Sequence, residues 1–551
     1  MYVESAGPVP GLGIFARSWC TSALNLYIKR NQGFTLNPFT SKRVKLFLFL
    51  GLAIFPAQAL FPSRAVSRDV FLTIGGGYSP TGNQISLEKN VQLFSSYLVE
   101  SYTQPPEHYI FFSDGDGQMR DLQYIPTDFP RVNEVLAQIN NRTSGLKYRY
   151  RNHEVPNVRG GANKSQIQNW FQKEGSGLAV GDRLIVYVTA HGGKSTDKEK
   201  PENSRLHLWN GQSIDVNEFR GWLELIDPEV PIIVVMVQCY SGGFANMILD
   251  PEKSGKASLE RPWCGFYATI PTRVAAGCTP DTREENYHEY TTYMMEALRG
   301  KTRLGQPVER PDFDGDGVVS LDEAHSFALI QSRTIDISMK TSDQYLRKIE
   351  ISLPEEGALD KDSDIDMLVE AASVNQSQII NALSEQLELQ EAQRATAATK
   401  LAERLSSEKK EAEQKRRQLI KDLQQNARSI RSGITFRWPE LNNSWNPECH
   451  RLLEEQGDQI LRAIEGHPRF GKFMELRQRM TEIAEEAMDA DRKWVKCQRL
   501  IRTLDSVARA SNLRKYGSTA EVDRYEALVR LESSLLGNAA DPTIDSAEGQ
   551  P

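Results

Sequence analysis

Two short apolar segments of this chain each lead into a residue that can carry out thiol chemistry. With their continuations they read Leu184-Ile-Val-Tyr-Val-Thr189, Ala190-His191-Gly192-Gly193 and Ile232-Ile-Val-Val-Met-Val237, Gln238-Cys239-Tyr240-Ser241-Gly242-Gly243. Both segments are rich in β-branched residues and are cut off by glycine, which predicts two buried parallel strands. Since chemistry in open α/β sheets takes place outside the carboxyl ends of the strands, the imidazole and the thiol can meet in one crevice.

A histidine and a cysteine placed in this way could form a catalytic dyad. The thiolate is the nucleophile, and an imidazole can both generate and stabilise it. The two residues are 239 − 191 = 48 positions apart. The glycines allow backbone N–H groups to approach a substrate carbonyl, so Gly192 and Cys239 are the candidate donors of an oxyanion hole. A lone buried cysteine or histidine is usually structural, and only the joint placement favours catalysis.

The two motifs, with their spacing and strand contexts, resemble the caspase-like cysteine peptidases, the clan of caspases, metacaspases and legumains. The legumain-like branch is the closest. The resemblance covers about half of the chain, from Asp69 to Ile335, and includes a first strand at Asp69–Gly77 followed by a helix over residues 86–100. It implies an α/β fold with a mostly parallel sheet flanked by helices. It also implies a cysteine endopeptidase that cleaves peptide bonds through a thioester.

The chain departs from the family where the family selects its substrate. Val237 stands where legumains and metacaspases carry an acidic residue, and Ile85 stands where legumains carry an arginine. Asn83 matches an asparagine of legumains, so the resemblance assigns it the orientation of His191. Val237 predicts a preference for an uncharged residue before the cut, since an unpaired charge is costly to desolvate.

A second motif fits the twelve-residue calcium loop at each defining place. Its predicted ligands are Asp312, Asp314, Asp316, the carbonyl of Val318, Ser320 and Glu323, with Gly317 at the sharp turn. Hard Ca²⁺ prefers six to eight oxygen ligands, which such a loop supplies. The preceding segment, residues 301–311, is a poor helix, so a single structural Ca²⁺ site is expected rather than a paired sensor. The alternative is an acidic turn that holds no metal. No catalytic cofactor is expected.

The N-terminal region, residues 1–65, contains the layout of a secretory signal. A basic stretch, Ser41–Lys45, precedes an apolar core, Leu46–Phe55, and a small-residue cleavage pattern that ends at Ala59. The protein is therefore expected outside the cytoplasm, periplasmic or extracellular, with an uncleaved membrane anchor as the alternative. The net charge of −7 argues against a nucleic-acid partner.

The cysteines agree with export. Apart from Cys20 and the candidate nucleophile, they form two local pairs that an oxidising compartment would favour as disulfides: Cys264 with Cys278 and Cys449 with Cys497. The alternative is four free thiols.

The composition of the chain changes after the α/β region and becomes typical of helices. Residues 66–335 form the predicted catalytic domain, 336–357 a linker, 358–432 one long helix with coiled-coil character, 433–536 a helical module and 537–551 a disordered tail. The segment 358–432 contains neither glycine nor proline and is dense in strong helix formers. The helices are expected to bind a protein partner or to self-associate. The resemblance to legumains also implies a tail that inhibits the enzyme, which removal of the chain after Ser352 would relieve.

The residues thus support two classes of function. The first is an exported cysteine endopeptidase, with transpeptidation as a variant in which an amine intercepts the thioester. The second is an inactive caspase-like scaffold whose helical tail binds a partner. The loss of the family's charged pocket residues favours the scaffold, and the retention of both His191 and Cys239 favours the enzyme.

Overall fold

The computed structural model describes residues 68–143, 145–249 and 261–537, which fall within one compact unit, Arg64–Pro551. The predicted signal segment, its cleavage site, Cys20 and almost all of the tail from residue 537 onward lie outside the described residues. No helix among the residues described is both long enough and apolar enough to cross a membrane.

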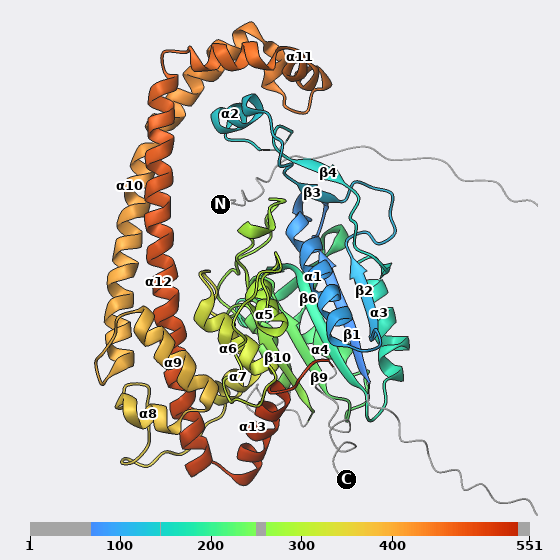
Figure 1. Cartoon of the computed structure of the whole chain (residues 1–551), viewed down its shortest axis with the longest axis vertical. Coiled ribbons are helices and arrows are strands. Elements are labelled where there is room, and N and C mark those ends of the chain that lie inside the picture. Colours follow the sequence, from blue (N-terminus) through green and yellow to red (C-terminus); the bar gives the residue numbers. More distant parts are fainter. Residues whose placement is uncertain (1–67, 144, 250–260, 538–551) are drawn as a thin grey trace, which may run out of the picture. The chain divides into compact units, whose positions relative to one another are not determined.

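A mostly parallel sheet forms the centre of the molecule, as the sequence predicts (Figure 1). The strands are β1 (Asp69–Gly76), β2 (Glu107–Phe112), β3 (Leu122–Tyr124), β4 (Arg149–Arg151), β5 (Val158–Gly160), β6 (Arg183–Gly193), β7 (Arg205–Leu208), β8 (Gln212–Asp215), β9 (Ile232–Met236), β10 (Trp263–Tyr267) and β11 (Met339–Lys340). Their order is β11-β10-β9-β6-β1-β2-β5. Only the edge strand β11 and the β7–β8 extension of β6 run antiparallel in this sheet, and β3 pairs with β4 separately.

Helices cover both faces of the sheet. The α-helices of this half are α1 (Ile85–Ser101), α2 (Arg131–Asn140), α3 (Lys164–Lys173), α4 (Val216–Leu223), α5 (Tyr290–Arg299), α6 (Leu321–Gln331) and α7 (Thr341–Lys348). The short 3₁₀ helices are η1 (Pro80–Gly82), η2 (Gly175–Gly177), η3 (Trp209–Gly211), η4 (Ser241–Ile248) and η5 (Glu284–Asn286). Helix α1 packs with α5, and α3 packs with α4. Right-handed crossovers that leave the centre in opposite directions place these two pairs on opposite faces.

The chain order fixes where a site can form. Strand β1 lies next to the central strand β6, with β2 on its other side. The loops after β1 and β6 therefore diverge at the carboxyl edge, which is the switch point where α/β sheets bind ligands. The strands that lead there are buried on both faces, because β6 from Leu184 to Ala190 and all of β9 lie in the main hydrophobic core.

The helical region differs from the expected single helix over 358–432. It contains α8 (Ile365–Ala371), α9 (Val374–Gln386) and α10 (Arg394–Arg437), followed by η6 (Pro439–Asn442), α11 (Pro447–Glu465), α12 (Phe470–Tyr516) and α13 (Thr519–Glu532). A capping box at Ser373 starts α9, and Glu388, with a φ of +56°, follows its end. These local signals interrupt the helix without glycine or proline.

The expected linker and parts of the C-terminal helical region belong to the folded core. Residues 336–357 contain β11 and α7, so this segment is not a simple linker. Side chains from α12 and α13, among them Leu513 and Leu528, belong to the same hydrophobic cluster as the sheet. A chain that ends at Ser352 would therefore lose part of its core, and this truncation is a poor test of inhibition by the tail.

The expected disulfides are wrong for the structure, because all five described cysteines are free. Cys264 lies in the core cluster of the sheet, whereas Cys278 packs at the edge of the cluster beneath α1. Cys449 and Cys497 likewise belong to two separate clusters. The paired positions in the sequence do not meet because each thiol fills a different apolar core, as a small hydrophobic side chain does.

Candidate active site

The two candidate catalytic residues lie at the carboxyl ends of neighbouring strands, His191 among the last residues of β6 and Cys239 after the end of β9. Strands β6 and β9 are parallel, and their last paired residues are Val188 and Met236. His191 lies 191 − 188 = 3 residues beyond that pair, and Cys239 lies 239 − 236 = 3 residues beyond it. The structure thus brings both to one edge of the sheet, as the sequence predicts.

Gly192 lies directly against the backbone of the nucleophile. A β-carbon on Gly192 would fall 2.0 Å from the carbonyl oxygen of Cys239 and 2.7 Å from Cγ of Gln238. No side chain fits there, so glycine is required for the close approach of the two strand ends. This places the backbone of the expected oxyanion donors, Gly192 and Cys239, side by side.

The loop after β1 holds the imidazole. Nε2 of His191 lies 2.8 Å from the carbonyl oxygen of Gly82 and 3.0 Å from Oε1 of Gln84. The ring of Tyr78 packs edge-on against the imidazole, with ring centroids 5.3 Å apart. Three residues of one short loop therefore fix the ring position.

These contacts determine which nitrogen of His191 can act as the base. Both partners of Nε2 are oxygen acceptors, so in the neutral ring Nε2 carries the proton and Nδ1 keeps its lone pair. Burial lowers the pKa of His191 to about 4, against the opposing effect of the Gly82 carbonyl. The imidazole is therefore neutral at pH 7, with the lone pair of Nδ1 free to accept a proton.

The thiol of Cys239 lies against the loop that follows β10. Its Sγ accepts a hydrogen bond from the backbone N–H of Ala275 at 3.3 Å. Burial raises the pKa of the thiol, the Ala275 contact lowers it, and the nearby carboxylate of Asp336 raises it. The resting pair is thus a neutral thiol and a neutral imidazole, and thiolate forms when the proton moves to the base.

Asn83 was expected to orient His191, but its side chain forms hydrogen bonds with other residues. It is fully buried, accepts a hydrogen bond from the N–H of Gly77 at 3.0 Å, and donates to Ser113 and to the carbonyl of Asp121, each at 3.0 Å. These contacts shape the loop that carries Gly82 and Gln84. Gly82 and Gln84, on either side of Asn83, contact His191 instead. The sequence pattern did not identify these two residues.

Of the two residues that depart from the legumain-like pattern, Val237 is partly buried and Ile85 is buried. Val237 packs against the main core and Ile85 is buried at the start of α1. Gln238, beside the nucleophile, is also buried, and its Oε1 has no hydrogen-bond partner among the described atoms. Among these residues, then, there is no charged group to select a substrate side chain.

The predicted calcium loop brings three of its carboxylates together, and Ser320 Oγ donates to one of them, Glu323, at 3.0 Å. Ligand oxygens of Asp312, Asp314 and Glu323 lie within 4.8 Å of one another. Oδ1 of Asp312 is buried without a hydrogen-bond partner, which fits a hard cation. Glu323 meanwhile accepts from Phe313 N at 2.7 Å and from Ser320 N at 2.8 Å, and Asp316 accepts from Val318 N at 2.9 Å. The residues fit Ca²⁺, which would take Glu323 from its backbone partners.

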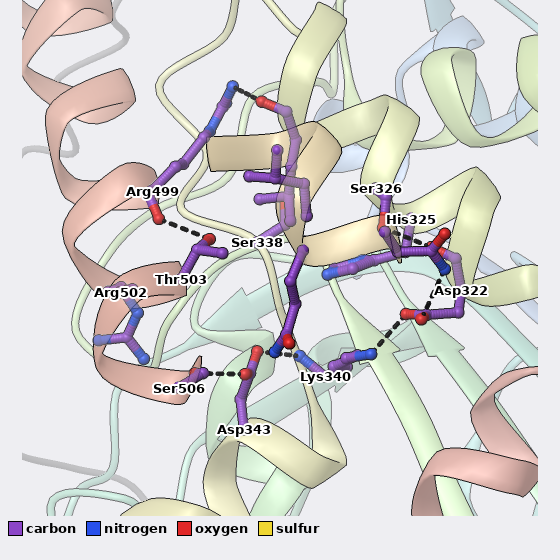
Figure 2. A pocket seen from close by; sticks show the side chains of 14 residues that line it. Asp322, His325, Ser326, Ser338, Lys340, Asp343, Arg499, Arg502, Thr503 and Ser506 are labelled. Carbon is purple, nitrogen blue, oxygen red and sulfur yellow. Dashed lines mark hydrogen bonds and ion pairs between the residues drawn. The ribbon is translucent and has the colours of Figure 1, made fainter. Parts of the chain in front are cut away.

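Two further features were not predicted from the sequence. Asp114, Asp121 and His153 form a second group with ligand atoms within 4.8 Å, although both ring nitrogens of His153 already have backbone partners. The sequence signal is weak, because the three residues are spread over forty positions. In addition, a cavity of about 30 Å³ lies between α6, α7 and α12 (Figure 2), which has room for little more than a water molecule.

Comparison with known proteins leaves the family open. No protein-family model matches the chain, and no curated protein matches it. Among solved structures, the chain is similar to the crystal structure of protein GSU0716 from Geobacter sulfurreducens, with 10% sequence identity and a TM-score of 0.26. The match covers 48% of this chain and 88% of that one.

Proposed function

We propose that the protein is a cysteine endopeptidase of caspase-like type, with Cys239 as the nucleophile and His191 as the base. The observation that supports this is the joint placement of the two residues. An imidazole whose Nε2 is held by Gly82 and Gln84 lies near the end of β6, and a half-buried thiol follows the end of β9 at the matching register. A histidine and a cysteine with only structural roles would not be expected to share this register.

The geometry supports a general-base mechanism. Nδ1 of His191 takes the proton of the Cys239 thiol while Sγ attacks the scissile carbonyl carbon. Backbone N–H groups at Gly192 and Cys239 stabilise the oxyanion. The imidazolium then donates its proton to the leaving amine as the C–N bond breaks. Water, deprotonated by the same imidazole, hydrolyses the thioester and restores the thiol. If an amine replaces that water, the outcome is transpeptidation.

Labelling with a thiol-directed peptidyl electrophile tests the proposal. Wild type is expected to label at Cys239, Cys239→Ala to lose the label, and His191→Ala to label at least about a hundredfold more slowly, the contribution typical of a positioned base. Cys278→Ala is the matched control, because Cys278 is also only partly buried, and it should label like wild type. Undiminished labelling of Cys239→Ala would exclude the enzymatic function.

The second candidate is an inactive scaffold. It is favoured by the absence of a charged residue at Val237 and Ile85, where the family selects its substrates. The same labelling separates the two functions, because a scaffold leaves Cys239 no more reactive than Cys278.

For the enzyme, the apolar Val237 still predicts cleavage after uncharged residues. A positional peptide library measures that preference, and strict cleavage after Arg, Lys or Asp would contradict it.

We also propose that the loop 312–323 binds a structural Ca²⁺ ion. At a hundredfold excess over its dissociation constant, Ca²⁺ is expected to stabilise wild type by about 2.7 kcal/mol. The melting temperature should rise accordingly. Asp312→Asn should abolish the increase. Glu309→Gln is the matched control, because Glu309 is an exposed carboxylate outside the loop, and this variant should keep the effect. Equal Ca²⁺ responses of both variants would reject the site.

Export and partner binding complete the proposal. The basic and apolar stretches of residues 41–55 support delivery to a compartment outside the cytoplasm. The helical region supplies a surface for a protein partner or for self-association. Recovery of mature protein that begins near residue 60 from a cell envelope or medium fraction tests the first statement, and recovery of peptides from residues 1–41 would contradict cleavage.

A further inference from the structure

The loop that contacts Cys239 also contacts the long helix α12. On one side, residues 273–275 meet the nucleophile segment, where Ala275 N–H donates to Sγ at 3.3 Å and the carbonyl of Arg273 accepts from Tyr240 N–H at 2.9 Å. On the other side, the Arg273 guanidinium donates to Oδ2 of Asp491 at 3.2 Å. It also lies over the ring of Trp494, 4.9 Å from the centroid. Arg273 thus links the nucleophile segment to α12.

Asp336 provides a second link. Its Oδ1 accepts a hydrogen bond of 2.7 Å from the N–H of Ala276, the residue after the one that contacts the thiol. Its backbone carbonyl accepts from Nε of Arg499 on α12 at 2.8 Å. Arg499 is only 1% exposed and also donates to two further carbonyls, those of Leu329 and Ser332. A fully buried guanidinium with three backbone partners holds this segment firmly.

The surroundings of both links are closed. Asp491 is 4% exposed and also pairs with Lys409 of α10 at 3.1 Å, so the ion pair joins both long helices to the loop. Apolar residues of the loop, Val274 and Ala276, pack against the cluster that includes Val495 of α12. Figure 2 shows the next turns of α12, where Ser506 Oγ donates to Asp343 of α7 at 2.6 Å. Helix α12 is therefore docked over several turns.

We propose that α12 is part of the support of the nucleophile, with Asp336 as a positioning residue for Cys239 and Arg273, Asp491 and Arg499 as the connection between loop and helix. This inference rests on the proposed function of Cys239. It assigns the helical region a role opposite to inhibition by cover: α12 keeps loop 273–276 in place, and a partner that shifts the long helices lowers thiol reactivity.

Two substitutions of Asp336 separate position from charge. Asp336→Asn keeps an oxygen acceptor for Ala276 N–H, whereas Asp336→Ala removes it. The positioning role predicts that Asp336→Ala lowers kcat about a hundredfold, the cost of about 1 Å of misplacement, with little change in KM. Asp336→Asn should keep kcat within about tenfold of wild type. Equal losses in the two variants would overturn the positioning role.

The connection to α12 is tested with substitutions in the helix. Asp491→Asn should slow the alkylation of Cys239 by iodoacetamide about tenfold or more in the full chain, and Arg273→Gln should add little to it, because both break one connection. Asp489→Asn is the matched control, since Asp489 lies on the same helix and makes an exposed pair with Arg492. It should alkylate like wild type.

The outcomes distinguish this inference from the proposed function. If Asp491→Asn and Asp336→Ala are alkylated at the wild-type rate while Cys239 still reacts with the peptidyl electrophile, the role of α12 is rejected and the enzyme stands. If Cys239 of wild type does not react with that electrophile, the proposed function itself fails. Circular dichroism confirms that each variant is folded before its rate is used.

Discussion

The histidine and the cysteine of the candidate site are held in two different ways. His191 is fixed by Tyr78, Gly82 and Gln84, which all belong to the loop after β1 in the α/β half. Cys239 is contacted by loop 273–276, which in turn depends on α12, more than two hundred residues further along the chain. The α/β half alone therefore positions the base, whereas the support of the nucleophile extends to helix α12. A partner can thus act on one half of the dyad without disturbing the other.

The largest effect is expected where the two sides meet. In Gly192→Ala the new methyl group would fall 2.0 Å from the Cys239 carbonyl, so the strand ends must separate. We expect kcat/KM to fall about a thousandfold, because both the dyad and the oxyanion donors move. Gly221→Ala is the control, since a β-carbon there meets nothing within 4 Å. A Gly192→Ala enzyme with near wild-type kcat/KM would show that the two strand ends are not coupled.

A smaller loss is expected on the histidine side alone. Gln84→Leu removes one of the two oxygens that face Nε2 and leaves the Gly82 carbonyl in place. We expect about a tenfold fall in kcat, since the remaining hydrogen bond still favours the active tautomer. Ser79→Ala, in the same loop, removes only a side-chain contact with Thr81 and should have no effect. Steady-state kinetics of the two variants provide the measurement, and equal rates would exclude an orienting role for Gln84.

The same contrast explains what could be predicted from the sequence. The strands β6 and β9 and the placement of His191 and Cys239 at their ends were predictable, because β-branched runs and terminal glycines are local signals. The side chain that contacts Nε2 of His191 was missed by one position, since an irregular loop has no periodicity to show which side chain faces the histidine. Asn83 faces inward and Gln84 faces His191.

The support of Cys239 was beyond any local pattern. Its contacts join Arg273 to Asp491 and Asp336 to Arg499, pairs separated by 218 and 163 positions. The disulfide prediction failed for a related reason: composition suggests that cysteines can pair, and only the packing shows that each lies in its own core. The break before α9, by contrast, could have been found, because Ser373 and Gln376 form a recognisable capping box.

The smallest effect, and the sharpest distinction between the two sides, concerns pH. The pKa of His191 is lowered to about 4 and that of Cys239 is raised, so the dyad rests in its neutral form above about pH 4. The rate of alkylation by iodoacetamide should therefore rise steadily from pH 5 to 9, without the plateau near neutrality that a preformed thiolate–imidazolium pair gives. A plateau below pH 7 would contradict the neutral resting state.

Variants on the two sides should change this profile differently. The carboxylate of Asp336 raises the pKa of Cys239, so Asp336→Asn should move the profile to lower pH, by less than about one unit. Burial raises the pKa of Asp336 itself to about 6, although the Ala276 N–H, Arg499, Thr334 and Arg273 around it all lower that pKa. Because the wild-type carboxyl is protonated below that value, the two profiles should converge in acid. Gln84→Leu, by contrast, should lower the rate at every pH and leave the shape unchanged. A shifted profile in Gln84→Leu would mean that His191 and Cys239 share one electrostatic environment. The support within the α/β half and the support by α12 would then not be separate.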